Sequence, residues 1–192
     1  MDAPFDAAVL AAKEGAPWAW EQLYSWLSPR LLGYIRARGS RDPEAALGEV
    51  WMQLARNTPT FEGNAAGFRS WAFTVAHHRV IDEARRRERE PQTMPLDDGL
   101  AAAEHRLGIV EGDPSALELE DLAAVISFLP DLQQSTLLLR IIGDLSVAET
   151  ASALEVSESA VKSAQYRAIN ALRTRLGKSA TKLGAPSVTD VT

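Results

Sequence analysis

The sequence predicts an all-α protein made of two small helical domains joined by an acidic, flexible linker. Apolar residues recur at spacings of three and four along most of the chain, which is typical of amphipathic helices, and no alternating strand pattern is found. Charge also divides the 192 residues, because residues 91–120 carry the whole net charge of -6 and the segments on either side are each neutral. We therefore expect domains at 1–90 and 118–176, a linker at 91–117 and a disordered tail at 177–192.

Composition excludes several classes of protein. A hydrophobic fraction of 46% and a mean hydropathy of -0.14 fit a soluble globular protein, and no stretch approaches the roughly 20 apolar residues of a membrane span. The N-terminal segment MDAPFDAAVL lacks the positive start and apolar core of a signal peptide, so the cytoplasm is the expected location. There is no cysteine, which excludes disulfides and thiolate metal sites.

The first domain is predicted to contain four helices. A short helix at 4–14 is followed by one that begins at Pro17, where a missing N–H costs little, and ends near Gly39. Pro29 is expected to kink or interrupt this second helix. The apolar stripe of the second helix consists of Trp20, Leu23, Tyr24, Leu27, Leu31, Tyr34 and Ile35.

Two further helices complete the first domain. The third is expected at 43–56, and Leu47, Val50, Trp51 and Leu54 form its apolar face. A loop at 57–64 follows from its Pro, Gly and Asn content. The fourth helix is expected at 66–89, with Phe68, Trp71, Ala72, Val75 and Ala76 facing inward.

Between the domains, residues 90–117 contain three prolines and three glycines and show weak periodicity. We interpret this segment as a linker with a short helical piece near 101–107. The second domain then begins with an apolar stripe formed by Leu122, Val125, Ile126 and Leu129.

The rest of the second domain predicts a helix-turn-helix. A helix at 131–142 is stopped by Gly143, and Ser146 with Glu149 matches a capping box that opens a short helix to Leu154. Glu155 and Val156 form the turn, and Ser157 caps the last helix. Glu155 stands where the turn favours glycine, at a cost on the order of 1 kcal/mol.

In a helix-turn-helix the second helix enters the major groove of DNA, with its N-terminal residues at the base edges. The buried stripe of this helix is Val161, Ala164, Ala168, Leu172 and Leu176, and its exposed face offers Ser159, Lys162, Ser163, Tyr166 and Arg167. These side chains can bind phosphate or base edges. The alternative is a plain helical hairpin with solvated charges.

A second basic cluster ends the fourth helix of the first domain: Arg79, Arg85, Arg86, Arg87 and Arg89. One interpretation is helix electrostatics, because arginines favour a helix C-terminus and Asp82–Arg86 and Glu83–Arg87 are i,i+4 pairs. The other is single-stranded DNA binding, in which bases stack on Trp71 or Phe73 and cations follow the backbone. Trp71 fits a core position better than a stacking platform. The loop at 61–64 could instead receive an unstacked base.

His77, His78 and Asp82 raise the question of a metal site. His78 and Asp82 share a helix face, but the chain supplies no matching carboxylate or histidine for a full ligand set. We therefore expect no metal and no cofactor. The sequence also contains no Gly-rich phosphate loop and no nucleophile–base arrangement.

Three segments together resemble an extracytoplasmic-function (ECF) sigma factor, the smallest class of RNA polymerase specificity subunit. Residues 68–87, FRSWAFTVAHHRVIDEARRR, are similar to the family pattern FRxWLFxIARNxxIDxxRRR. Residues 129–176 are similar to the family's helix-turn-helix pattern LPxxxRxVLxLRxxxGLSxxEIAxxLGVSxGTVKSRLxRAxxxLRxxL. Residues 42–51 resemble the segment with which the family binds the polymerase clamp. Three matches in order at the right spacing are specific to this family.

The resemblance implies a sigma region 2 bundle at 1–90, a region 4 helix-turn-helix at 118–176, and no catalysis. The partners that it implies are promoter DNA, the clamp of the largest catalytic polymerase subunit, the flap of the second largest and an anti-sigma factor. The clamp contacts would be Asp42, Glu49 and Gln53. The minus-ten contacts would be Phe61, Asn64, Arg69, Trp71, His77, His78, Arg79, Arg85, Arg86 and Arg87. The minus-thirty-five contacts would be Ser157, Ser159, Lys162, Ser163, Tyr166 and Arg167.

The chain departs from the family pattern at several of these positions. Ala45 and Gly48 replace Asp and Gln in the clamp segment, and His77-His78 replaces Arg-Asn. In the recognition helix Ala160, Ala164 and Gln165 replace Thr, Arg and Leu. These differences affect the promoter sequence that the chain would read.

The resemblance also gives the acidic linker a hypothetical role, in which it threads a basic channel of the polymerase toward the RNA exit. The alternative is a solvated connection. Two other functions stay open from the residues alone: a helix-turn-helix regulator that acts without polymerase, and an all-helical enzyme that uses Asp82 and the histidines.

Overall fold

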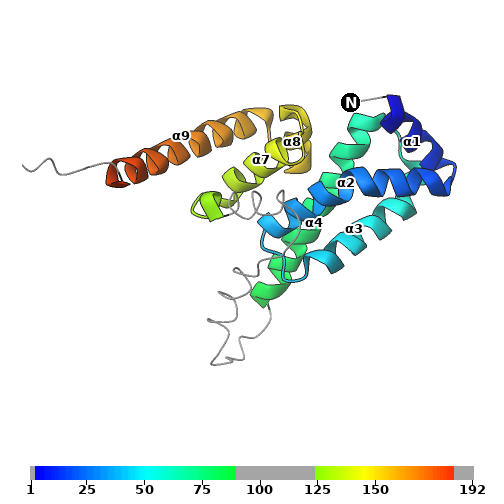
Figure 1. Ribbon diagram of the computed structural model, residues 1–192, viewed down its shortest axis with the longest axis horizontal. Helices are drawn as coiled ribbons and strands as arrows, with labels where there is room; N and C mark the ends of the chain where they lie inside the picture. The colour runs from blue at the N-terminus through cyan, green and yellow to red at the C-terminus, as the bar shows by residue number, and fades with distance from the viewer. Residues whose placement is uncertain (1–2, 90–123, 184–192) are drawn as a thin grey trace, which may run out of the picture.

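The computed structural model describes residues 3–89 and 124–183, and every regular element in these two ranges is a helix (Figure 1). The elements are α1 (Ala3–Lys13), α2 (Pro17–Ala37), α3 (Pro43–Asn57), the 3-10 turn η1 (Thr58–Thr60), α4 (Ala65–Arg89), α7 (Asp131–Ile141), α8 (Val147–Ala153) and α9 (Glu158–Leu183). The predicted all-α class is confirmed. The acidic linker, its helical piece near 101–107 and Leu122 lie outside the described residues.

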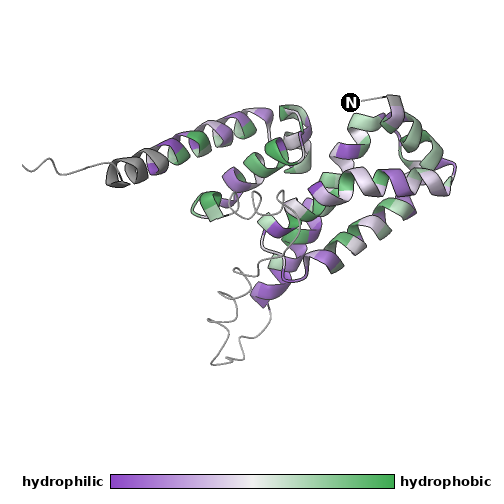
Figure 2. Cartoon of the chain, viewed as in Figure 1, coloured by the Kyte–Doolittle hydropathy of each residue, from purple (hydrophilic) through white to green (hydrophobic). Residues whose placement is uncertain are grey.

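Helices α1–α4 form one bundle around aromatic and aliphatic side chains. Its largest fully buried members are Tyr34, Phe68, Phe73, Leu23, Leu31, Ile35 and Leu54. Figure 2 shows hydrophobic and hydrophilic positions alternating around each helix, as amphipathic helices require. Burial of these apolar faces stabilises the bundle by roughly 1.5–3 kcal/mol for each large side chain.

Helix α2 runs without a break through Pro29, so the predicted interruption is absent. Proline lacks an N–H and leaves the carbonyl of the residue four positions earlier without a helical partner. Here that residue is Ser25, and both Ser25 and Pro29 are exposed, so water satisfies the carbonyl. Gly39 ends the helix region in a left-handed conformation with φ 76°, as predicted.

A carboxylate links the connection between α2 and α3 to α4. Glu83 accepts hydrogen bonds from the Ser40 hydroxyl at 2.7 Å and the Arg41 N–H at 2.8 Å. Burial raises the pKa of the Glu83 carboxyl, but these hydrogen bonds, with Arg87 and Arg79 nearby, outweigh burial and leave the pKa below its ordinary value. Glu83 is therefore ionised at neutral pH and binds this connection.

The second domain is α7–α9, and it packs against the first. Helix α7 contacts α2, and α8 contacts α4 (Figure 1). Gly143 lies at the junction, because a Cβ at this position would stand 3.3 Å from Cδ1 of Phe73. The buried residues of both domains form one continuous cluster, so the domains are joined in this conformation.

The last helix is longer than the sequence predicts. The tail was expected to be disordered from 177, but α9 continues to Leu183. This extension is rich in Ala, Leu and Lys, which are good helix formers, and its one glycine, Gly177, is tolerated. Side chains are described up to Arg175, so the expected burial of Leu176 lies outside the described residues.

Candidate nucleic-acid interface

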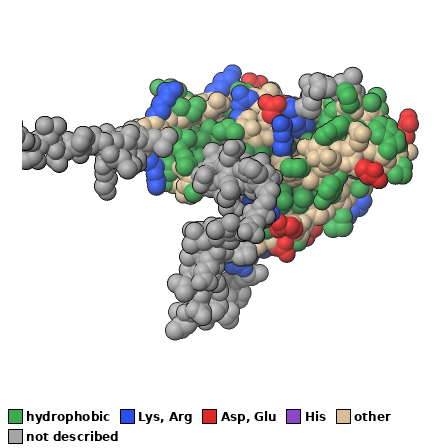
Figure 3. All heavy atoms as spheres, viewed as in Figure 1, with side chains coloured by type: hydrophobic (Ala, Val, Ile, Leu, Met, Phe, Trp, Pro, Cys, Tyr) green, Lys and Arg blue, Asp and Glu red, His purple; other side chains and the backbone are tan. Residues whose placement is uncertain are grey.

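The N-terminal half of α9 presents the residue face predicted for DNA reading. Val161, Ala164 and Ala168 are fully buried on one side of the helix. The opposite side exposes Ser159, Lys162, Ser163, Tyr166 and Arg167, and 69% of Tyr166 is open to solvent. Figure 3 shows Lys and Arg side chains on the part of the surface formed by α9.

Local interactions fix this recognition helix. The Ser146 hydroxyl accepts from the Glu149 N–H at 3.1 Å, and the Glu149 carboxylate accepts from the Ser146 N–H at 2.6 Å. The predicted capping box is thus confirmed. Ser157 caps α9 by accepting from the Ala160 N–H at 3.2 Å, so this predicted DNA contact has a structural task as well.

Two turns of the second domain hold acidic residues in the left-handed region. Glu155, between α8 and α9, has φ 54°, and Asp144, after α7, has φ 52°. This conformation costs a residue other than glycine roughly 1–2 kcal/mol. The sequence indicated the strain at Glu155 but gave no signal for Asp144.

In the first domain an aromatic cluster lies at the start of α4. The Phe61 and Trp71 rings are stacked with centroids 5.2 Å apart at an interplanar angle of 15°, and Phe68 meets both edge-on at 5.5 Å. A Cβ at Gly63 would lie 2.7 Å from the Phe61 ring, so a larger residue there would displace this ring. Exposed Asn64 accepts from the Gly67 N–H at 2.9 Å and caps the helix. Phe61 and Trp71 are half-buried, so each keeps one accessible part.

The C-terminal end of α4 carries the predicted arginine cluster. Arg85, Arg86 and Arg89 are exposed, and Arg87 is half-buried. Arg85 lies 3.8 Å from Asp82, an exposed i,i+3 pair that contributes little. Glu83, which was expected to pair with Arg87 along the helix, makes its hydrogen bonds to Ser40 and Arg41 instead. The exposed guanidiniums are available to phosphate.

Several predicted contacts on α4 are buried in this conformation. Phe73 is completely buried, so it cannot serve as a stacking platform in the folded domain. Arg69 and His77 are each 7% exposed, whereas the sequence predicted that both face DNA. Their burial was missed because the residues that cover them come from helices distant in the sequence.

His77 is a neutral core histidine. The Tyr34 hydroxyl and His77 Nδ1 are 2.8 Å apart. Burial raises the pKa of the Tyr34 hydroxyl well above its ordinary value, so this hydroxyl stays protonated and donates to Nδ1. Burial, together with Arg38 and His78, lowers the pKa of His77 to about 4. The imidazole is therefore uncharged at neutral pH.

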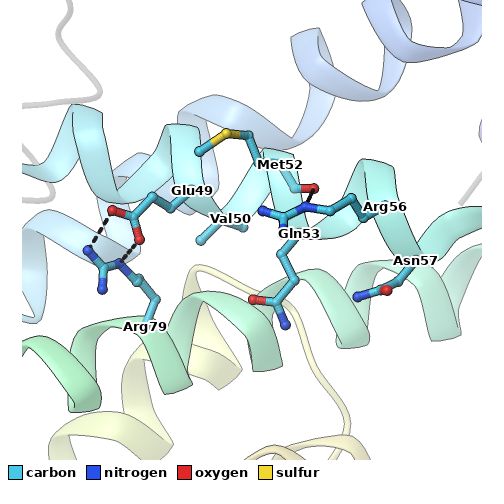
Figure 4. Close-up of a pocket in the computed structure, with 7 residues that line it drawn as sticks. All are labelled: Glu49, Val50, Met52, Gln53, Arg56, Asn57 and Arg79. Carbon is cyan, nitrogen blue, oxygen red and sulfur yellow. Dashed lines mark hydrogen bonds and ion pairs between the residues drawn. The ribbon is translucent and has the colours of Figure 1, made fainter.

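Arg79 and Glu49 connect α4 to α3. Arg79 binds the Glu49 carboxylate at two points, 2.8 Å from Nη2 and 2.7 Å from Nε (Figure 4). They line an open pocket of about 480 Å³ with Val50, Met52, Gln53, Arg56 and Asn57. Arg79, a predicted minus-ten contact, and Glu49, a predicted clamp contact, are thus paired with each other. Exposed Asp42, the third clamp candidate besides Glu49 and Gln53, caps α3 at the Ala45 N–H at 2.9 Å.

Within the described residues, three side-chain pairs cross the junction between the domains, and no sequence pattern predicted them. Arg38 pairs with Asp131, and its guanidinium also lies 3.4 Å from the Gln134 side-chain oxygen. Arg69 Nη1 lies 2.9 Å from Asp144, and His78 Nε2 lies 3.7 Å from Glu155. The two arginines are nearly buried, with 6% and 9% of their side chains exposed.

The described residues offer no metal site and no membrane helix. No three His, Asp or Glu side chains within 3–89 and 124–183 meet in an arrangement that could hold an ion. In the same ranges, none of the helices combines the length and hydrophobicity needed to cross a bilayer.

Comparison with known families assigns both domains. Sigma-70 region 2 matches residues 23–90, and Sigma-70 region 4 matches residues 119–172. ECF RNA polymerase sigma factor ShbA of Streptomyces griseus is 29% identical over a 176-residue alignment that covers 87% of this chain and 92% of the relative. ECF RNA polymerase sigma factor SigX of Bacillus subtilis is 27% identical over 156 residues, or 80% of this chain and 77% of SigX.

A solved structure shares the fold. CnrH, determined in complex with the cytosolic domain of CnrY, superposes with a TM-score of 0.66 at 19% identity and covers 91% of this chain and 98% of CnrH.

These features define a two-domain transcription initiation factor that carries a region 2 bundle and a region 4 helix-turn-helix. The chain belongs to the ECF sigma factors of bacterial RNA polymerase. Such proteins direct transcription initiation and catalyse no reaction themselves, so the enzyme alternative is set aside.

Proposed function

We propose that this sigma factor reads the minus-thirty-five element with α9. The observation that carries this proposal is the exposed face of Ser159, Lys162, Ser163, Tyr166 and Arg167 behind a fully buried stripe. Lys and Arg side chains bind guanine edges or phosphates, and Ser and Tyr hydroxyls donate and accept. Ser157 lies at the N-terminus of the same helix, where phosphate binding is favoured.

The minus-ten element would bind at the loop 57–65 and α4. The stacked Phe61 and Trp71 rings, with Asn64 beside them, offer aromatic surface to an unpaired base, and stacking contributes roughly 1–3 kcal/mol per base. Exposed Arg85 and Arg86, with Arg87, would follow the phosphates. Binding energy for unpaired bases shifts the promoter toward the melted state.

Helix α3 would dock on the clamp of the largest polymerase subunit. Its outer face exposes Ala45, Gly48, Met52 and Gln53, with Glu49 at the edge. Where the family pattern has Asp and Gln, this face has Ala45 and Gly48, so it is more apolar. The second domain would contact the flap of the second largest subunit.

The acidic segment 91–117 would pass through a basic polymerase channel and be displaced by the growing transcript. Its charge supports this proposal, because residues 91–120 hold the entire -6. Replacing its acids by Asn and Gln should weaken polymerase binding or change the yield of abortive transcripts. Unchanged initiation would leave it a solvated connection.

We also propose a cytoplasmic location and an anti-sigma partner. The structure of CnrH with the cytosolic domain of CnrY supports the idea that a protein with this fold receives a second chain.

The test is transcription from genomic DNA fragments by core polymerase, with and without this chain, with mapping of RNA 5′ ends. Discrete new starts that share a two-part upstream motif are expected. Tight DNA binding by the chain alone, without new starts, would favour a regulator that acts without polymerase.

A further inference from the structure

The charges at the domain junction are sorted by domain. The first domain supplies only bases to the three ion pairs, namely Arg38 from the end of α2 and Arg69 and His78 from α4. The second domain supplies only acids: Asp131, Asp144 and Glu155. Asp131 begins α7 and Asp144 follows its end, so the ion pairs hold both ends of this helix against the first domain.

Two of these acids sit where the backbone favours glycine. Asp144 and Glu155 both have positive φ, and no other residues except glycines do so within the described ranges. Each carboxylate reaches a base on α4, Arg69 or His78. Unfavourable backbone conformations persist where the surrounding contacts over-determine them. Here the contact is with the other domain, so folding of the helix-turn-helix alone does not explain the choice of acid.

The bases involved belong to the minus-ten contacts that the family resemblance implies. Arg69 and His78 are minus-ten candidates, and α8 packs on the helix that carries them. The Arg69 guanidinium has an acidic partner and a side chain only 9% exposed, so a DNA phosphate cannot reach it in this conformation. The second domain and the minus-ten strand therefore require the same face of α4.

We propose that Asp144 and Glu155 act as an intramolecular substitute for DNA phosphates, and that their ion pairs with Arg69 and His78 keep the free sigma factor closed. This inference rests on the proposed function of α4. On opening, a DNA phosphate would replace the Asp144 carboxylate at the Arg69 guanidinium. The closed form suppresses nonspecific DNA binding by the first domain, and docking on polymerase, which separates the domains, uncovers α4.

Both acids can be removed without harm to the turns. Asp144→Gly with Glu155→Gly relieves the left-handed backbone while it removes both carboxylates. Asp144→Asn with Glu155→Asn is a second test, since asparagine tolerates positive φ and stays polar. Glu21→Gln, at an exposed position of α2, is the matched control for charge.

The first measurement determines the distance between a label on the first domain and a label on the second. The chain has no cysteine, so Ser25→Cys on α2 and Ser152→Cys on α8, both exposed, accept spin labels cleanly. A narrow distribution of label distances is expected for the parent and for the control. In both double variants the population at longer distances should rise about tenfold. An unchanged distribution in both variants would overturn the proposal that these ion pairs hold the protein closed.

The second measurement determines how tightly single-stranded DNA binds the chain in the absence of polymerase, as a test of whether α4 is accessible. A short fluorescein-labelled single-stranded DNA should bind about tenfold more tightly to both double variants than to the parent or to Glu21→Gln. Longer label distances with unchanged DNA affinity would refute competition for α4. The label distances do not depend on promoter recognition, so failure of the proposed function would appear separately, as absence of new transcription starts.

Discussion

The basic surfaces of α9 and α4 differ in how many of their side chains already bind other residues of the protein. On α9 the candidate side chains for DNA face solvent, and only Lys162 has a nearby acid, Glu158 at 3.6 Å on the same helix. On α4, by contrast, Arg69, His77 and Arg79 have partners in other parts of the fold: Asp144 in the turn after α7, Tyr34 on α2 and Glu49 on α3. The exposed Arg85, Arg86 and Arg89 at the C-terminal end of α4 resemble α9 more closely. In this conformation the proposed duplex-reading surface on α9 is therefore open, whereas part of the proposed minus-ten surface on α4 is engaged by the protein itself.

The largest effect is expected at α9. Lys162→Ala with Arg167→Ala should lower transcription from a mapped promoter about a hundredfold or more, because each base-edge contact contributes about 1–3 kcal/mol. The melting temperature should stay unchanged, since these side chains contribute little to the fold. Transcription assays and thermal unfolding check both parts. Arg30→Ala, an exposed arginine of α2, is the control, and equal losses in the two proteins would contradict the assignment.

A smaller effect concerns stability in acid. The pKa of His77 is about 4 in the folded protein, below the ordinary 6.5 of the unfolded chain. Above pH 6.5 both states hold neutral His77, so its contribution is fully present there. As pH falls from 6.5 to 4 the unfolded state alone gains a proton, and about 3 kcal/mol of stability is lost.

Replacement of His77 checks this effect. His77→Gln keeps an acceptor for the Tyr34 hydroxyl and removes the titration. Urea unfolding at several pH values should give a flatter profile for this variant between pH 6.5 and 4. The same slope in both proteins would exclude His77 as the source.

The smallest effect concerns the capping box that orients α8. Ser146→Ala should destabilise the second domain by about 1 kcal/mol, because the Glu149 N–H loses its acceptor. Hydrogen exchange of amides in α8 and α9 would report the change locally. Ser152→Ala, exposed on the same helix, is the control and should show no loss.

Sequence patterns predicted the helices because the residues of each apolar stripe lie close together in the sequence. The third helix and the capping box at Ser146 follow from neighbours at most four positions apart. The long-range pairs do not, because Arg38 and Asp131, or Arg69 and Asp144, are joined only by the packing of two domains. Residue type also misled at Arg69, since arginine is rarely buried without an acidic partner and that partner is far along the chain.

The candidate site was predictable to a similar extent. The exposed face of α9 could be read from helical periodicity, since one face was apolar and the other polar. Which aromatic residues of α4 are buried could not, because Phe73 and Trp71 differ only in which neighbours cover them. Phe73 lies against Tyr34 with ring centroids 5.9 Å apart, a contact between helices far apart in the sequence.

The hydrogen bonds that Glu83 accepts from Ser40 and Arg41 have a mechanical consequence. They attach the segment just before α3 to the C-terminal third of α4, and the Arg79–Glu49 pair joins α4 to α3 itself. Because two separate contacts join them, α3 and α4 move as one rigid unit. If polymerase docks on α3 as proposed, these contacts already orient α4, so the arriving strand would meet a helix that requires no further ordering.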